Sequence, residues 1–195
     1  MDSTELMARY CDGDAHAFRE LYALIAPRLY GYLVKICRHR TLAADLLQHT
    51  FLKVHRARAA YIRGADPVPW IYAIAHRTFI DEARKQQKDI VRPVRDHDPE
   101  QSANLEGDPD QNRNELVDSD LVTAALSALA QLSYEQRQAV VLTKLEGKTL
   151  AEAAEIAGTS VTAMKVRAHR GFKILRRIMA HPGRSPDLAI EGGPS

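Results

Sequence analysis

A basic run near the carboxyl end of the chain has the spacing of a DNA-reading helix. No acidic residue occurs between Ile156 and Pro186. Opposite charges three or four residues apart normally support a solvated helix, so a face of one sign needs another partner. DNA phosphates supply one, and side chains near the start of such a helix can reach base edges in the major groove. The basic residues nearest the start are Lys165, Arg167, His169, Arg170 and Lys173.

Two short helices with a glycine turn between them would position this run. Thr149 opens the first, with Glu152 three residues later as a capping box. Gly158 lies in the break, where glycine most easily adopts a positive φ. Ser160 can cap the second helix. A short helix, a tight turn and a basic second helix form a helix-turn-helix, whose second helix enters the major groove.

The second helix should bury one face and expose the other. Arg167 falls at the flank between the apolar face and the basic face. The alternative to DNA binding is a basic face that is merely solvated. Residues three and four apart share a helix face. The apolar residues at that spacing are Val161, Met164, Ala168, Phe172, Leu175 and Met179, and the opposite face carries Lys165, His169, Arg170, Lys173, Arg176 and Arg177.

The first 87 residues also predict helices, with no strand alternation and no hairpin turn. Apolar residues recur at three and four from Ala17 to Ile36. A second helix, capped by Thr41, continues through Val54. A loop rich in Gly and Pro covers residues 61–69, and a third helix runs from about Pro69 to Gln87.

Residues 88–115 predict a flexible connector. Residues 88–120 hold 4 Lys and Arg against 10 Asp and Glu, with few large apolar residues. Such a segment cannot bury enough surface to offset its ordering entropy. The flanking segments are basic. Residues 1–87 hold 13 Lys and Arg against 9 Asp and Glu, and residues 133–180 hold 9 Lys and Arg against 4 Asp and Glu. This sign asymmetry favours a nucleic-acid partner.

We therefore expect an all-α protein with two small helical domains, residues 1–87 and 116–180, and a disordered tail, 181–195. In the second domain, Ser133 and Gln136 form a capping box for a helix that ends at Gly147.

Several classes of function are excluded by what the sequence lacks. No Gly-rich phosphate loop, nucleophile triad or paired carboxylate is visible, so we expect a non-enzyme without catalytic residues. The eight histidines form no HExxH motif, so we expect no metal and no cofactor. Cys11 and Cys37 predict two reduced thiols. No apolar run approaches about 18 residues, and the acidic amino terminus is not a signal peptide, so we expect a cytoplasmic protein.

The order of these motifs resembles that of bacterial sigma factors of the extracytoplasmic-function (ECF) group. The resemblance covers residues 15–88 and 121–180. It rests on "ADLLQHTFLKV", then "PWIYAIAHRTFIDEARK", then the helix-turn-helix. It implies two domains, called region 2 and region 4, in a dissociable subunit that binds RNA polymerase core and directs promoter-specific transcription initiation.

The resemblance also implies contact residues. In the family, the Asp-Leu-x-Gln-x-x-Phe-x-Lys helix binds the clamp helices of the largest catalytic subunit of the polymerase. His49 stands where the family usually has an acid, which removes a charge from this surface. Packing in the hydrophobic core is the alternative role for Phe51, the aromatic residue of this motif. The motif positions here are Asp45, Gln48, Phe51 and Lys53.

Promoter contacts follow in the same way. Single-stranded bases are held by stacking and a basic surface. Trp70 and Tyr72 are expected to pack the loop against its helix. The positions implied for the minus-ten element are Tyr61, Arg63 and Arg77, with Arg84 and Lys85 on backbone phosphates. Those implied for the minus-thirty-five element are Lys165, Arg167, His169 and Arg170, with Lys173 beside them.

Two other functions each fit part of the chain. An autonomous helix-turn-helix regulator would not need "ADLLQHTFLKV", and a sigma-like decoy that sequesters an anti-sigma factor would not need the basic run. The chain has both features, which favours the sigma factor. The resemblance further implies an anti-sigma factor, often membrane-anchored, that holds the protein inactive until a stress signal. No small-molecule substrate is expected.

Overall fold

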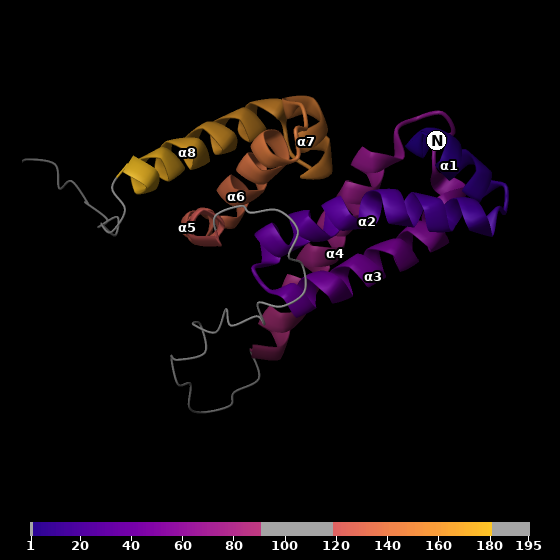
Figure 1. Cartoon of the computed structure of the whole chain (residues 1–195), viewed down its shortest axis with the longest axis horizontal. Coiled ribbons are helices and arrows are strands. Elements are labelled where there is room, and N and C mark those ends of the chain that lie inside the picture. The colour runs from indigo at the N-terminus through magenta and orange to yellow at the C-terminus, as the bar shows by residue number, and fades with distance from the viewer. Residues whose placement is uncertain (1, 91–118, 181–195) are drawn as a thin grey trace, which may run out of the picture.

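The computed structural model describes residues 2–90 and 119–180, and all elements in these ranges are helical (Figure 1). The predicted all-α fold is confirmed. Most of the predicted connector and the whole predicted tail lie outside the described residues. The elements are α1 (Ser3–Cys11), α2 (Ala15–Cys37), α3 (Arg40–Ala57), η1 (Arg58–Ala60), α4 (Pro67–Ile90), α5 (Ser119–Ala130), α6 (Tyr134–Val140), η3 (Val141–Leu145), α7 (Leu150–Ile156) and α8 (Val161–Ala180).

Helices α2 and α3 form an antiparallel pair joined by a very short turn. Arg38 ends α2 in the left-handed region, with φ of 62°. The ring nitrogen of His39 then accepts a hydrogen bond from the backbone N–H of Leu42 and caps α3. The prediction that Thr41 caps this helix is therefore wrong, because the left-handed turn lets the helix begin at Arg40, two residues before the start that a Thr41 cap would give.

Helix α4 begins at Pro67, two residues before the predicted start, and extends three residues beyond the predicted end. The first four N–H groups of a helix have no partner within it, so prolines at its first and third positions remove no hydrogen bond. The Asp66 carboxylate accepts from the N–H of Val68 and supports this start. Pro69 thus lies inside the first turn.

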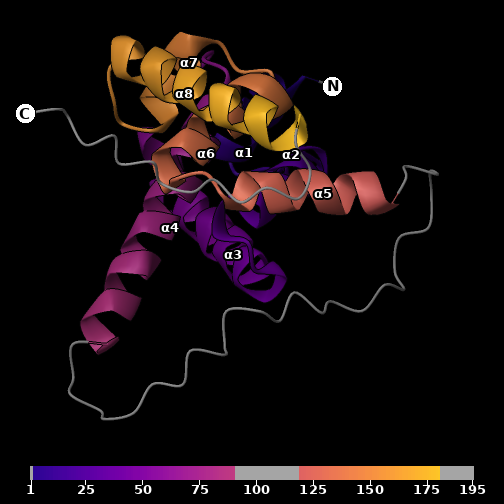
Figure 2. The same cartoon turned by 90° about the vertical axis from the view of Figure 1, so that its left-hand side faces the viewer.

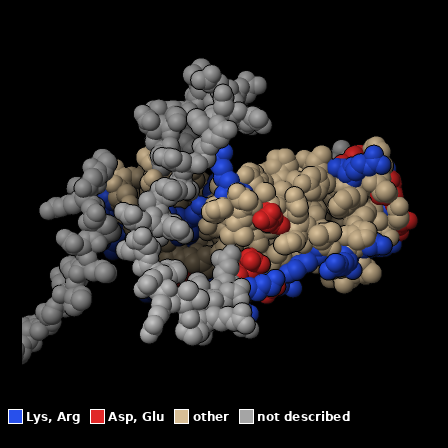
Figure 3. All heavy atoms as spheres, turned by 90° about the horizontal axis from the view of Figure 1, so that it is seen from below, with Lys and Arg blue, Asp and Glu red and all other residues tan. Residues whose placement is uncertain are grey.

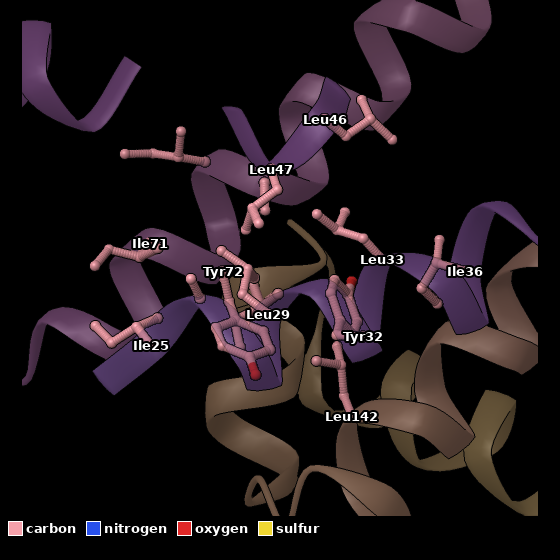
Figure 4. Close-up of a cluster of buried hydrophobic side chains, with 14 of the residues drawn as sticks. Ile25, Leu29, Tyr32, Leu33, Ile36, Leu46, Leu47, Ile71, Tyr72 and Leu142 are labelled. Carbon is pink, nitrogen blue, oxygen red and sulfur yellow. The ribbon is translucent and has the colours of Figure 1, made fainter. Parts of the chain in front are cut away.

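The apolar faces of α2, α3 and α4 meet in the core. Leu29, Leu33, Leu46 and Ile71 are almost wholly buried (Figure 4). Each such side chain contributes about 1.5–3 kcal/mol relative to remaining exposed.

Helices α5 to α8 form the second group, and both predicted capping boxes are confirmed. The side chains and backbones of Ser133 and Gln136 bond reciprocally, as do those of Thr149 and Glu152. The helix expected to continue to Gly147 instead leaves α-helical geometry after Val140, and η3 forms a wider π-helical turn.

The buried seam of α8 differs from the predicted one. Met164 and Gly171 are buried, whereas Val161, Phe172 and Met179 are exposed, so that part of the prediction is wrong. The reason is close approach of α8 to α6: a Cβ on Gly171 would lie 2.8 Å from a methyl group of Val140. The glycine lies toward α6, and the seam runs through Met164, Ala168, Gly171 and Leu175.

The two groups of helices share one core. Leu142 of η3 lies beside Tyr32 of α2 in Figure 4, and both belong to the same buried cluster. Helix α6 and η3 contact α2, and α7 contacts α4. Figures 1 and 2 both show α6 and α7 against the first group. Nothing in the sequence predicts this packing.

Candidate functional site

One face of α3 presents polar and apolar groups to solvent. Asp45, Gln48 and His49 are exposed, and Leu52 is 53% exposed. The spacing of these residues places them on one side of the helix. Sequence reasoning missed Leu52, although its position four residues after Gln48 was the available signal. This face offers a hydrogen-bonding rim around an exposed leucine, as a protein-binding surface does.

The other two motif residues lie elsewhere. Phe51 is buried, with its ring centroid 4.6 Å from that of Tyr22 and 6.2 Å from that of Phe18. It therefore packs the core in this conformation. Lys53 Nζ lies 3.0 Å from the Asp81 carboxylate and joins α3 to α4.

A groove of about 630 Å³ between α3 and α4 brings two predicted sites together. Its walls include His49, Leu52 and Lys53 from α3 and Arg84 and Lys85 from α4. Figure 3 shows the underside of the molecule, where Lys and Arg lie along the edges of a largely uncharged surface. Residues implied for polymerase and for promoter phosphates thus face one hollow.

The loop before α4 buries one predicted promoter contact and exposes another. Tyr61 is 8% exposed, its hydroxyl donates to the Ala65 carbonyl, and its ring packs 5.6 Å from Trp70. The expected packing role of Trp70 is confirmed. Tyr61 does not present its ring to solvent in this conformation. Ile62, which sequence reasoning did not single out, is 78% exposed.

Arg63, also in this loop, is held by an ion pair. Its guanidinium lies 2.5 Å from the Asp12 carboxylate. The hydrogen bond from Arg63 lowers the pKa of Asp12. Both side chains are more than half exposed, so an anionic ligand can compete with Asp12 for the arginine.

Two of the minus-ten candidates on α4, Arg77 and Arg84, also face the helix-turn-helix. Arg77 and Arg84 are exposed. Both line a second hollow, of about 520 Å³, whose opposite wall includes Glu155, Ile156 and Gly158. The surface implied for one promoter element therefore lies against the turn of the motif implied for the other.

The basic face of α8 is open to solvent. Lys165, His169, Arg170 and Lys173 are exposed, while Arg167 is half-buried at the flank. The Ser160 hydroxyl accepts from the N–H of Ala163, so the predicted cap is confirmed. Gly158 has φ of +60°, as the turn requires.

An unpredicted aromatic contact lies on the same helix. Phe172 is 43% exposed, and the cationic groups of Lys144 and Arg176 lie 5.8 and 5.5 Å from its ring centroid. These cations cover the exposed ring and extend the positive surface toward η3.

His76 occupies the junction between the two groups of helices. Its Nδ1 lies 2.8 Å from both the Tyr134 hydroxyl and the Gln138 amide nitrogen of α6. Burial lowers the pKa of His76 to about 4. A neutral ring is the form that can accept these bonds. Tyr72 is also buried at this junction and not against the loop, which corrects its expected role.

Within residues 2–90 and 119–180, no group of three or more His, Cys, Asp and Glu could hold a metal ion. Both cysteines are free thiols. None of the described helices is long and apolar enough to cross a membrane.

Comparison with known proteins gives a consistent result. The family model for sigma-70 region 2 matches residues 21–89, and that for sigma-70 region 4 matches residues 123–175. The chain is 37% identical over 175 residues to the RNA polymerase sigma factor CarQ of Myxococcus xanthus, covering 89% of this chain and 95% of CarQ. It is 34% identical over 179 residues to the ECF RNA polymerase sigma factor SigF of Caulobacter vibrioides, covering 89% and 92%.

Two solved structures share the fold. The sigma factor RpoE from Bartonella quintana, solved with the anti-sigma factor NepR, superimposes with a TM-score of 0.68 at 21% identity, covering 85% of this chain and 98% of that one. CnrH, solved with the cytosolic domain of CnrY, gives a TM-score of 0.64 at 20% identity, covering 91% and 97%.

Proposed function

This chain belongs to the ECF sigma factors of RNA polymerase, and on that premise we propose how its surfaces direct the polymerase to promoters. The family consists of proteins that are not enzymes, and we infer that this chain acts by binding alone, in the cytoplasm. We assign region 2 to residues 1–87, the connector to 88–115 and region 4 to 116–180. The observation that carries the proposal is that one chain holds both the exposed α3 face and an acid-free recognition helix.

The α3 face is the proposed polymerase contact. Asp45 and Gln48 can bond a partner's donors, and Leu52 can enter an apolar site on it. His49 leaves this face with one acid fewer than is usual in the family. Lys53 borders the contact from the groove, and Phe51 supports it from beneath by packing against Tyr22.

The promoter contacts divide by their chemistry. On α4, Arg77, Arg84 and Lys85 are exposed cations that suit single-strand phosphates. Arg63 joins them when phosphate displaces Asp12. Tyr61 contributes a stacking surface only if the loop opens, because its ring is covered by Trp70.

On α8, exposure separates the roles. Lys165 and Arg170 project from the first half of the recognition helix, and in the major groove such side chains can reach guanine edges. His169 and Lys173 extend the same exposed face, and half-buried Arg167 suits a phosphate at its flank.

Control by an anti-sigma factor is part of the proposal. In the two solved complexes, RpoE is bound to the anti-sigma factor NepR and CnrH to the cytosolic domain of CnrY. We extend such control to this chain: an anti-sigma factor that covers the polymerase-binding face would hold it inactive until a stress signal. Copurification of a partner that blocks core binding would test this.

Transcription by purified core polymerase on a promoter library tests the central activity. Wild-type protein should select a defined pair of elements. Asp45→Arg with Gln48→Ala should lower core affinity by about tenfold or more, since interface residues that matter cost over about 1 kcal/mol each when truncated. Glu5→Arg with Gln131→Ala makes the same charge change at exposed positions away from α3 and should have no effect. Equal core affinity of the α3 variant and wild type would contradict the proposed contact.

A further inference from the structure

Val166 is an exposed apolar residue at the centre of the basic face of α8. It stands two residues after Met164 and two before Ala168, which is about 200° around the helix from each of them. Met164 is fully buried, and Ala168 packs against the core. Val166 therefore points directly away from the buried seam, and 41% of its surface is exposed.

The first two turns of α8 differ in chemistry from the turns that follow. Their exposed residues are Val161, Thr162, Lys165 and Val166, of which only the lysine is charged. From His169 to Arg177, the exposed residues are His, Lys or Arg apart from Phe172. Valine and threonine favour an exposed helix less than alanine, leucine or lysine do. Helix stability therefore does not account for the exposed β-branched residues at this end.

The place of these residues in the helix-turn-helix is the place where base edges are read. In this motif the residues near the amino end of the second helix contact base edges, while other contacts fix the protein on the phosphates. Helix α8 lies along the outer edge of the second group of helices (Figure 1). Isolated exposed valines are common on protein surfaces, but Val166 lies on the surface that base edges would cover.

Only one group on the major-groove edge of the bases matches an apolar side chain. All four bases present hydrogen-bond donors or acceptors there, and thymine adds a C5-methyl group. A valine placed against the polar edges would displace water from them without replacing its hydrogen bonds, which is costly. A valine placed against the thymine methyl group removes apolar surface of both partners from water.

The side chain of Val166 is also preset for such a contact. A valine in a helix occupies one χ1 rotamer about 90% of the time, so its methyl groups lose little freedom when a ligand covers them. Thr162 lies on the same side of the helix, four residues and about 6 Å before Val166. Its hydroxyl can bond to any base edge nearby. The pair thus offers an apolar contact and an adaptable polar contact side by side.

We propose that Val166 reads the methyl group of a thymine in the upstream promoter element, with Thr162 on the same or a neighbouring base pair. This contact rests on the proposed function, because it requires α8 to enter the major groove. It adds a discrimination that the cations do not supply, since Lys165 and Arg170 suit the acceptors of guanine.

Deoxyuridine in place of thymine tests this contact, because it removes the methyl group and keeps every hydrogen-bonding group of the base. The full chain with purified core polymerase first selects upstream elements from a randomised promoter library, and the selected element should contain a thymine on one strand. Each thymine is then replaced in turn by deoxyuridine, and equilibrium binding of the holoenzyme is measured. One replacement should weaken binding by about fourfold, the effect of losing the burial of one methyl group.

Val166→Ala should bind the thymine promoter and the deoxyuridine promoter equally at that position. Val161→Ala is the matched control, since it makes the same change at a valine that is 49% exposed but lies about 140° around the helix from Val166. This control should keep the fourfold ratio of the wild type. The ratio should also be the same at several salt concentrations, because the replacement leaves the phosphates unchanged.

The outcomes separate this contact from the proposed function. A selected element without thymine, or equal binding of thymine and deoxyuridine promoters by the wild type at every position, would overturn the contact and leave the proposed function standing. A fourfold ratio that persists in Val166→Ala would also overturn it. So would an equal loss of affinity for both promoters in Val166→Ala, which would place Val166 against the polymerase or the DNA backbone. A holoenzyme that selects no upstream element would overturn both proposals.

Discussion

Single side chains on α8 differ in exposure, and this difference should separate reading from anchoring. Lys165 and Arg170 are exposed in the first half of the helix, whereas Arg167 is half-buried at its flank. Bidentate contacts to a base discriminate by about 1–3 kcal/mol. A phosphate contact adds affinity without sequence information.

We therefore expect Lys165→Ala or Arg170→Ala to relax the preference at one position of the upstream element. Arg167→Ala should weaken all promoters alike and reduce the salt slope by about one. Holoenzyme selection on a randomised upstream element, at several salt concentrations, measures both effects. An unchanged preferred sequence in both Lys165→Ala and Arg170→Ala would move base reading to other residues, such as Thr162 or His169.

His76 should make stability depend on pH. Its pKa is lowered from an ordinary value of 6.5 to about 4 in the folded chain. The stability it contributes is therefore present above pH 6.5 and is lost as pH falls toward 4, because the unfolded chain binds up to about one proton more in this window. The groups facing or flanking it are Tyr134 and Gln138 of α6, Glu155 of α7, and Arg77, Asp81 and Arg84 of its own helix.

Thermal melts between pH 7.5 and 5 check this dependence. The melting temperature of the wild type should fall as the pH is lowered from 7.5 to 5, and that of His76→Gln should fall less. A wild-type slope in His76→Gln would show that other groups cause the loss.

The close contact between α6 and α8 depends on a glycine, Gly171, which has no side chain. Gly171 brings the two helices so close that an added Cβ would lie 2.8 Å from Val140 Cγ2 and 3.1 Å from the Gln136 carbonyl oxygen. Backbone carbonyls cannot move aside as a flexible side chain does. Gly31, in the interior of α2, offers a contrast, because the nearest atom to its added Cβ is Lys35 Nζ at 3.8 Å.

Gly171→Ala should lower the free energy of unfolding by about 1–3 kcal/mol through overpacking. Gly31→Ala should raise it by roughly 0.5–1 kcal/mol, because alanine favours a helix interior. Urea denaturation of both variants measures the difference. Equal stability of the two variants would mean that α8 shifts outward without cost.

At the scale of the whole molecule, the shared core should keep the two regions together without a covalent connection. Composition predicts that proteases cut residues 88–115 first. The cleaved halves should still elute as one species from a sizing column, since α6 and η3 remain docked on α2. The halves of Glu146→Lys should separate, because the buried Glu146 carboxylate accepts from Tyr72 and pairs with Lys35 of the other half, and a lysine would face Lys35 with the same charge. Separate elution of the wild-type halves would contradict a stable docked state.

The sequence alone determined the features that depend on near neighbours. The Ser133 and Thr149 caps, the Gly158 turn and the helical periodicity each need only residues within one or two turns, so local patterns suffice. The motif from Asp45 to Lys53 indicated the family for the same reason, because all of its residues lie within one helix and their spacing can be read from the sequence.

Tertiary structure decided the features that depend on residues far away in the chain. Phe51 is buried because Tyr22 lies across from it, and α8 turns its seam inward at Gly171 because Val140 leaves no room for a side chain. Glu146 ends a predicted helix in the sequence, yet η3 widens the last turn and its partners stand 74 or more residues earlier. Periodicity cannot indicate which partner completes a buried charge, because that partner is fixed by packing between helices and not by spacing along one.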